Sequence, residues 1–216
     1  MSDKIKGLND TIAWYNANAQ IYSANIEDMP SLDYLDKFSN KVGRGGFVLD
    51  AGCASGRDTN LLRVRNLHAI GIDLSNSLLE IARQRYPDLE FNEGNFLDLP
   101  FQDNLFHGIW AHASLLHLES TEDVIKALLE FNRVLKRGGV IHIFVKQQLG
   151  KEKTSVVSDK LSGHDRFFQW FTKNEINRLM EKTHYLILEI EDDIPDQAGR
   201  PEVKWIRVLA SNNKPQ

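Results

Sequence analysis

The sequence lacks the features by which secreted and membrane proteins are usually recognised. It has a single cysteine, Cys53, so no internal disulfide can form. Its first ten residues alternate lysines with acids where a signal peptide would need an apolar stretch. The densest apolar run in the second half, residues 140–145, contains His142 and is far shorter than the roughly 18 residues of a membrane span. We therefore expect a cytoplasmic protein with no membrane partner.

An excess of positive charge is also absent. The chain carries 26 lysines and arginines against 30 acids, for a net charge of -4. It offers no electrostatic footprint for nucleic acid, so no nucleic-acid partner is expected. Of its 216 residues, 42% are hydrophobic, which suffices for the core of one larger domain without metals or crosslinks. Residues 1–216 are therefore predicted to form a single domain with no bound metal.

Short β-rich runs alternate with helical patterns from Phe47 onward, which is typical of a parallel α/β sheet. The link between the last two runs, residues 191–202, has no room for a crossover helix and contains two prolines and a glycine. These two strands are therefore predicted to pair as an antiparallel hairpin. The predicted strands cover residues 47–50, 68–73, 89–92, 106–111, 140–145, 185–190 and 203–210.

The first 42 residues have a helical pattern. Ile12, Tyr15, Ala19 and Tyr22 share one face of a predicted first helix, and a second helix is predicted over residues 31–38. We expect residues 1–42 to form a helical lid on a core of residues 43–216.

Capping residues mark the ends of three later helices. Ser75 is a good N-cap for one of them, and Thr172 with Glu175 has the spacing of a capping box at the start of another. Gly138 and Gly139 stand where a C-terminal cap would end a third helix, which lies between these two in the chain.

A glycine-containing loop, residues 52–56, lies directly between the first predicted strand and a helix. Nucleotide-like ligands bind at this position in open α/β sheets. Gly52 and Gly56 would let the backbone approach a ligand, and the following helix offers free N–H groups to a carboxylate or phosphate. The dinucleotide fingerprint G-x-G-x-x-G is absent because Ala54 stands two residues after Gly52, which argues against a nicotinamide cofactor.

Two acids follow the first two strands. Asp73 comes 23 residues after Asp50, close to the spacing of about 20 at which an acid reaches ribose hydroxyls. Asp73 also suits the role of a strand-end or helix-capping acid. Asp50 could order the loop, hold a ligand ammonium group, or do both.

Five runs carry a family resemblance: VLDAGCASGRDT, GIDLS, EGNFLDLPF, FHGIWAHASLLHL and LKRGGVIHI. In their order and separations they resemble the class I S-adenosylmethionine-dependent methyltransferases, firmly over residues 47–145 and loosely in the closing hairpin. Ala54 departs from the glycine of many relatives. The resemblance implies a Rossmann-like, doubly wound α/β fold with a mostly parallel seven-stranded sheet, an antiparallel C-terminal strand, and S-adenosyl-L-methionine as cofactor.

Carried over by position, the resemblance assigns a cofactor site. Asp73 and Leu74 are expected at the ribose, and Asn95 and Phe96 at the adenine. An Asn95 carbonyl can accept from the adenine amine, and an aromatic ring can pack on the base. Many relatives have aspartate at position 95, and Asn95 beside Gly94 could instead be a turn residue. The methionine moiety is expected among Asp50, Ala51, Gly52 and Ala111.

Three further residues have an expected place beside the cofactor and an alternative structural role. Arg57 could pair with the cofactor carboxylate or be a solvated helix-start arginine. Tyr15 and Tyr22 could surround the sulfonium, where aromatic faces attract cations and exclude water, or form a core-facing stripe.

His112 is the candidate general base, because histidine titrates near neutral pH and this one follows the fourth predicted strand. A histidine that only satisfies a loop carbonyl is the alternative. Residues 146–171 are expected to be a long irregular loop that walls the acceptor site. We expect an apolar pocket with few charges, suited to a small neutral or aromatic acceptor and lined by Tyr15, Trp110, Phe167 and Trp170.

The predicted function is methyl transfer to an oxygen or nitrogen of a small molecule. A non-catalytic sensor that binds S-adenosylmethionine and a methyltransferase acting on protein or RNA are the alternatives. The sequence indicates no oligomeric state.

Overall fold

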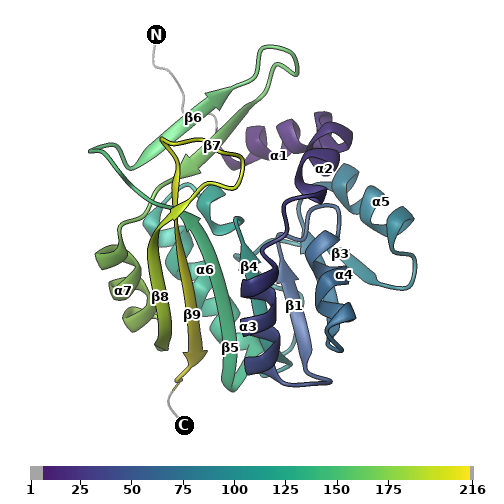
Figure 1. The fold of residues 1–216 in the computed structure, drawn as a ribbon, viewed down its shortest axis with the longest axis vertical. Coiled ribbons are helices and arrows are strands. Elements are labelled where there is room, and N and C mark those ends of the chain that lie inside the picture. The colour runs from purple at the N-terminus through teal and green to yellow at the C-terminus, as the bar shows by residue number, and fades with distance from the viewer. Residues whose placement is uncertain (1–6, 215–216) are drawn as a thin grey trace.

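The computed structural model describes residues 7–214, and its centre is a seven-stranded sheet with helices on both faces (Figure 1). The strand order is β3-β2-β1-β4-β5-β9-β8. β9 runs antiparallel to both of its neighbours, whereas β1 to β5 pair in parallel, as predicted. The strands are β1 (Phe47–Ala51), β2 (His68–Asp73), β3 (Glu90–Glu93), β4 (Phe106–His112), β5 (Leu135–Lys146), β8 (Tyr185–Pro195) and β9 (Lys204–Asn212).

Two layers of helices enclose the sheet. α3, α4 and α5 cover one face, and α6 and α7 cover the other (Figure 1). The predicted caps of α5 and α7 are confirmed: Ser75 accepts from Leu78 N–H, and Thr172 forms a full capping box with Glu175. These helices are α3 (Leu32–Val42), α4 (Arg57–Val64), α5 (Asn76–Arg85), α6 (Thr121–Val134) and α7 (Lys173–Lys182).

Strand alternation decides which side chains can reach a ligand. In β1, Leu49 and Ala51 point into the core beneath α6, so Val48 and Asp50 point to the face that carries α3 and α4. β4 repeats the pattern, with Ala111 in the core beneath α6 and Trp110 toward α3. Polar groups at the carboxyl ends of β1, β4 and β5 therefore gather on the α3 face.

The predicted glycine cap of α6 is wrong. The helix ends at Val134, and β5 begins at Leu135, which pairs with Phe106. Both of these residues are fully buried. Strand pairing and burial at Leu135 outweigh the local cap signal of Gly138 and Gly139. Both glycines lie inside β5.

The N-terminal lid also differs from its prediction. Its first helix is two helices, α1 (Leu8–Ala17) and α2 (Ala19–Glu27), which meet at Asn18, and the second predicted helix is α3. Residues 1–6 of the predicted lid lie outside the described residues. Within residues 7–214, no helix is both long enough and apolar enough to cross a membrane.

Residues 146–171 are not an irregular loop. They contain an antiparallel hairpin of β6 (Thr154–Ser158) and β7 (Asp165–Gln169), which stands beside α1 above the carboxyl edge of the sheet (Figure 1). Phe167 and Phe168 are buried, which explains why an aromatic sequence forms ordered strands here. The hairpin and α1 together roof the edge where the candidate site lies.

Candidate functional site

The glycine loop between β1 and α4 is held in an unusual backbone conformation. Gly52, Ala54 and Gly56 all have positive φ angles, of 83°, 48° and 80°. A Cβ atom added to Gly52 would lie 2.4 Å from the Ser114 Cβ, and one added to Gly56 would lie 2.6 Å from the Phe91 ring. Glycine is required at both positions because left-handed backbone and close packing coincide there. Ala54 adopts the same conformation with a small side chain, so the loop tolerates this departure.

Asp73 connects the end of β2 to the glycine loop. Its Oδ2 accepts from the Ala54 N–H at 2.9 Å and its Oδ1 from the Ser75 N–H at 2.8 Å. Burial raises the pKa of Asp73, although the backbone donors oppose this shift. The structural role considered for Asp73 is therefore real, and each carboxylate oxygen keeps a further lone pair for a ligand.

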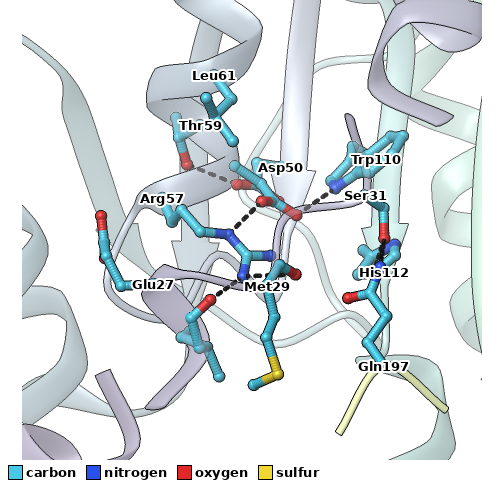
Figure 2. Close-up of polar contacts among 12 residues, drawn as sticks. Glu27, Met29, Ser31, Asp50, Arg57, Thr59, Leu61, Trp110, His112 and Gln197 are labelled. Carbon is cyan, nitrogen blue, oxygen red and sulfur yellow. Dashed lines mark hydrogen bonds and ion pairs between the residues drawn. The ribbon is translucent and has the colours of Figure 1, made fainter. Parts of the chain in front are cut away.

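A buried polar network lies on the other side of the loop (Figure 2). Asp50 accepts from Thr59 Oγ1 at 2.6 Å, and both its burial and the nearby Asp58 raise its pKa. Asp58 accepts from Trp110 Nε1 at 2.9 Å and from Arg57 Nε at 2.7 Å. Burial opposes ionisation of Asp58, but Arg57, His112 and the Trp110 hydrogen bond together lower its pKa. Asp50 is thus a buried acid whose charge the chain does not fully stabilise.

Arg57 is not a solvated side chain. Besides Asp58, its guanidinium donates to the carbonyls of Ile26 and Met29, so it ties the link between α2 and α3 to the glycine loop (Figure 2). Neither of the two roles considered for Arg57 from the sequence included this contact, because it joins segments that are distant in the chain.

Two adjoining cavities open beside this loop, one of about 840 Å³ and one of about 100 Å³. Most of the predicted cofactor residues lie on them. The larger cavity is lined by Asp50 and Arg57, the smaller by Asp73, Leu74, Asn95 and Phe96, and both by Tyr15, Tyr22, Gly52 and His112. The side chains of Ala51 and Ala111 line neither, because strand alternation turns them into the core beneath α6.

Asn95 has the turn role considered from the sequence. Its Oδ1 accepts from the Leu97 N–H at 2.9 Å, and its side chain also lines the smaller cavity. The neighbouring Phe96 lines the same cavity and packs against Phe131, with ring centroids 5.5 Å apart.

Hydrogen bonds join α1 to the hairpin and close the roof. Trp14 Nε1 donates to Asp159 at 2.8 Å, and the Phe167 N–H donates to Thr11 Oγ1 at 2.9 Å. His117 Nδ1 lies 2.8 Å from the Phe167 carbonyl oxygen, which can only accept, so this nitrogen carries the proton. His117 Nε2 therefore accepts from the Tyr15 hydroxyl at 2.9 Å.

Tyr15 and Tyr22 have the core-packing role considered for them, and they also line both cavities. Their rings lie 4.9 Å apart and pack on the apolar cluster of Ala19, Leu78 and Ile81, while both side chains line the two cavities.

His112 lies where the two cavities meet, but it does not titrate near neutral pH as expected. Burial lowers its pKa to about 4, so it is neutral at pH 7. Its Nδ1 lies 3.1 Å from His142 Nε2. Its Nε2 lies 3.4 Å from the Ser31 hydroxyl (Figure 2). The imidazole is therefore positioned as a neutral hydrogen-bonding group.

The predicted acceptor pocket is only partly right. Of the four predicted residues, only Tyr15 lines the larger cavity. Trp110 and Phe167 are buried, and Trp170 also lies outside its lining. Its aromatic side chains are instead Trp14, Tyr22, Tyr34, Phe144, Phe168 and Trp205, beside Tyr15.

The expectation of few charges is wrong. Lys146, Arg166, Arg200 and Asp196 line the larger cavity. The position of Lys146 at the carboxyl end of a parallel strand is a signal that could have identified it.

Comparison with known proteins identifies the family. The model of a methyltransferase domain matches residues 49–143. An O-methyltransferase, rstn1, of Aspergillus nomiae is 34% identical over 172 residues, which are 72% of this chain and 71% of that protein. A demethylmenaquinone methyltransferase of Chlorobaculum parvum is 35% identical over 97 residues, which span 44% of this chain and only 39% of that enzyme.

Solved structures share the fold. The 1,6-didemethyltoxoflavin-N1-methyltransferase of Burkholderia thailandensis, solved with 1,6-didemethyltoxoflavin and S-adenosylhomocysteine, has a TM-score of 0.76 at 17% identity and covers 95% of this chain and 88% of its own. A methyltransferase of Methanosarcina mazei has a TM-score of 0.74 at 18% identity, covering 86% of this chain and 98% of its own. With the strand order and the glycine loop, these matches lead to one conclusion: the chain belongs to the class I S-adenosylmethionine-dependent methyltransferases.

Proposed function

We propose that this protein transfers a methyl group from S-adenosylmethionine to an oxygen or nitrogen atom of a small molecule. The observation that carries the proposal is the cavity of about 840 Å³ beside the glycine loop, roofed by α1 and the β6–β7 hairpin. Its volume is in the range of small-molecule sites. It shares His112 with the smaller cavity, so an acceptor in it would lie next to a bound cofactor.

The residues around the glycine loop fit the cofactor. Asp50 is a buried acid with a raised pKa, and a ligand ammonium would stabilise its charge. The remaining lone pairs of Asp73 suit ribose hydroxyls, with Leu74 beside it. Asn95 and Phe96 line the smaller cavity as an adenine site would require. Arg57, although engaged by the chain, lines the larger cavity close enough to the loop to meet the cofactor carboxylate.

When bound, S-adenosylmethionine supplies an electrophilic methyl group on a sulfonium. The chain has to align an acceptor lone pair and keep water out, and these effects account for most of the expected rate. Tyr15 and Tyr22 serve both needs because their rings line the cavities and anchor the roof. His112, neutral at pH 7, acts as a hydrogen-bond partner that orients the acceptor.

The named relatives support a small-molecule acceptor. One is an O-methyltransferase, and a structural neighbour is an N1-methyltransferase bound to a small heterocycle. They support oxygen and nitrogen equally, so both atoms stay in the proposal.

The test is incubation of the protein with methyl-labelled S-adenosylmethionine and a fractionated cell extract. We expect label in the small-molecule fraction. A Gly52→Val variant, whose side chain would fill the loop, controls for contaminating enzymes. Label confined to protein or RNA would contradict the proposal in favour of a macromolecular acceptor. Tight binding of S-adenosylhomocysteine with no label in any fraction would favour the sensor.

A further inference from the structure

The larger cavity is lined by three positive side chains that do not belong to the glycine loop. Lys146 ends β5, Arg166 lies in β7, and Arg200 lies in the link between β8 and β9. These three segments are remote in sequence, and only the fold brings their charges to one wall. We call Lys146, Arg166 and Arg200 the cationic wall.

One member of the cationic wall is already neutralised. Arg200 Nε and Nη2 each donate to Asp196, both at 2.8 Å. Asp196 also accepts from Trp205 Nε1 at 2.9 Å, which leaves this carboxylate fully engaged. Asp196 therefore forms its ion pair with Arg200 and positions Trp205.

Lys146 and Arg166 have no such partner. Lys146 Nζ lies 3.5 Å from the centroid of the Phe168 ring, and Arg166 lies 3.8 Å above the Trp14 ring and 5.5 Å from that of Phe168. Among the described residues, no carboxylate forms an ion pair with either cation. The Arg166 Nε is buried and has no hydrogen-bond acceptor.

This arrangement is costly for the chain alone. Lys146 and Arg166 both lie near the Phe168 ring, and their cation–π contacts do not supply a counterion. Burial, Arg200 and Arg166 together lower the pKa of Lys146 to about 8, against the opposing effect of Asp196. An anion between Lys146 and Arg166 would relieve the repulsion and give the buried Arg166 nitrogen an acceptor.

We propose that the methyl acceptor is a small organic acid, whose carboxylate binds between Lys146 and Arg166. The guanidinium of arginine matches the two oxygens of a carboxylate, and the lysine ammonium supplies a third donor. This inference rests on the proposed methyl transfer and replaces the neutral acceptor expected from the sequence. The cofactor carboxylate is a less suitable occupant, because Arg57 and the N-terminus of α4 lie at the glycine loop, where that group would be.

The first experiment measures anion binding without catalysis. Protein saturated with S-adenosylhomocysteine is titrated with benzoate and, separately, with benzamide at low salt in a calorimeter. We expect benzoate to bind at least about 10-fold more tightly, as for gain of a charge-assisted hydrogen bond. Benzoate that binds no better than benzamide would overturn the inference.

Variants locate the site. Lys146→Met and Arg166→Met should each weaken benzoate binding by about 10- to 100-fold, with the affinity for S-adenosylhomocysteine unchanged. Lys153→Met is the matched control, because Lys153 is exposed, pairs with Glu175 and does not line the cavity. Thermal melts verify folding, and Lys146→Gln replaces Lys146→Met if that variant melts early. A parallel loss of S-adenosylhomocysteine binding would assign the two cations to the cofactor and overturn the inference.

The second experiment separates this inference from the proposed function. Labelled product from the cell extract is passed over an anion-exchange resin at neutral pH. Retained label that is released when the carboxylate is esterified supports the acid acceptor. Small-molecule label in the flow-through supports methyl transfer but overturns the acid. Label on a product whose only anion is a phosphate overturns the carboxylate assignment. Absence of label contradicts the proposed function, and the benzoate titration then decides whether the anion site exists.

Discussion

The two ends of the larger cavity differ in how their charges are satisfied. At the glycine loop, the charged side chains Asp50, Arg57, Asp58 and Asp73 all have hydrogen-bond partners within the chain. At the cationic wall, neither Lys146 nor Arg166 pairs with a carboxylate of the described residues, and both lie against aromatic rings. The loop end is therefore organised before any ligand arrives. The cationic wall depends on a ligand to complete it.

The two ends also differ in how the chain builds them. The loop end comes from one continuous stretch, residues 50–58, and from the end of the adjacent strand β2. The other end combines α1, the end of β5, the hairpin and the link between β8 and β9. Substitutions at the acceptor end can therefore leave the cofactor end unchanged, because the two ends share few helices and strands.

The largest expected effect is at the preorganised end. Gly52→Ala places a Cβ atom 2.4 Å from the Ser114 Cβ in a left-handed backbone, so both strain and overlap oppose it. We expect a loss of about 2 to 5 kcal/mol in the free energy of unfolding, from a conformational cost of about 1 to 2 kcal/mol plus overpacking of about 1 to 3 kcal/mol. Urea unfolding measures the first quantity, and calorimetry should show weaker binding of S-adenosylhomocysteine.

Gly45→Ala is the control for that substitution. Gly45 also has a positive φ, of 76°, but nothing lies within 4 Å of its added Cβ. It should show only the conformational cost and bind S-adenosylhomocysteine normally. Equal effects of the two substitutions would mean that packing at the loop end is not tight.

The next effect concerns the histidines where the two ends meet. Burial lowers the pKa of both His112 and His117 to about 4. The unfolded chain therefore binds more protons than the folded protein between pH 6.5 and 4. Stability is full above pH 6.5 and falls as the pH drops toward 4, by about 2 to 3 kcal/mol for each histidine. Urea unfolding at pH 7 and pH 4.5 measures the loss.

His117→Gln isolates one of these contributions. Glutamine at position 117 cannot titrate. The difference in the free energy of unfolding between the wild type and this variant should therefore shrink by about 2 kcal/mol between pH 7 and pH 4.5. A constant deficit for His117→Gln would show that this histidine is not held neutral.

The same contrast explains what the sequence could predict. Gly52, Asp73 and the Ser75 cap belong to short local patterns, and the strand alternation fixed the parallel sheet. Local patterns could not predict that Arg57 would bind the Met29 carbonyl, or that Lys146 would lie on Phe168, because these contacts join distant segments. The prediction that Trp110 lines the acceptor pocket failed for a related reason. The sequence located the end of β4, but it did not show that the Trp110 side chain points into the core beneath α3.

A smaller effect is expected for the ribose assignment. Asp73→Ala should weaken binding of S-adenosylhomocysteine by about 1 to 3 kcal/mol, because ribose hydroxyls would lose a buried acceptor. Calorimetry measures the affinity. Asp88→Ala, an exposed acid just after α5, should leave it unchanged. Unchanged affinity in Asp73→Ala would restrict this acid to its contacts with Ala54 and Ser75.

The smallest effect tests whether the roof over the acceptor end opens independently of the loop end. Thr11→Val keeps the shape of a side chain that is 1% exposed but removes the acceptor of the Phe167 N–H. We expect a loss of about 1 kcal/mol confined to α1 and the hairpin. Amide hydrogen exchange should therefore quicken at Phe167 and stay unchanged at Gly52, whose N–H donates to the Ile72 carbonyl at 2.8 Å. Thr154→Val, on the exposed β6, should change neither amide. Equal acceleration at Phe167 and Gly52 would mean that the two ends unfold as one unit, and the contrast between a preorganised loop and a ligand-dependent wall would fail.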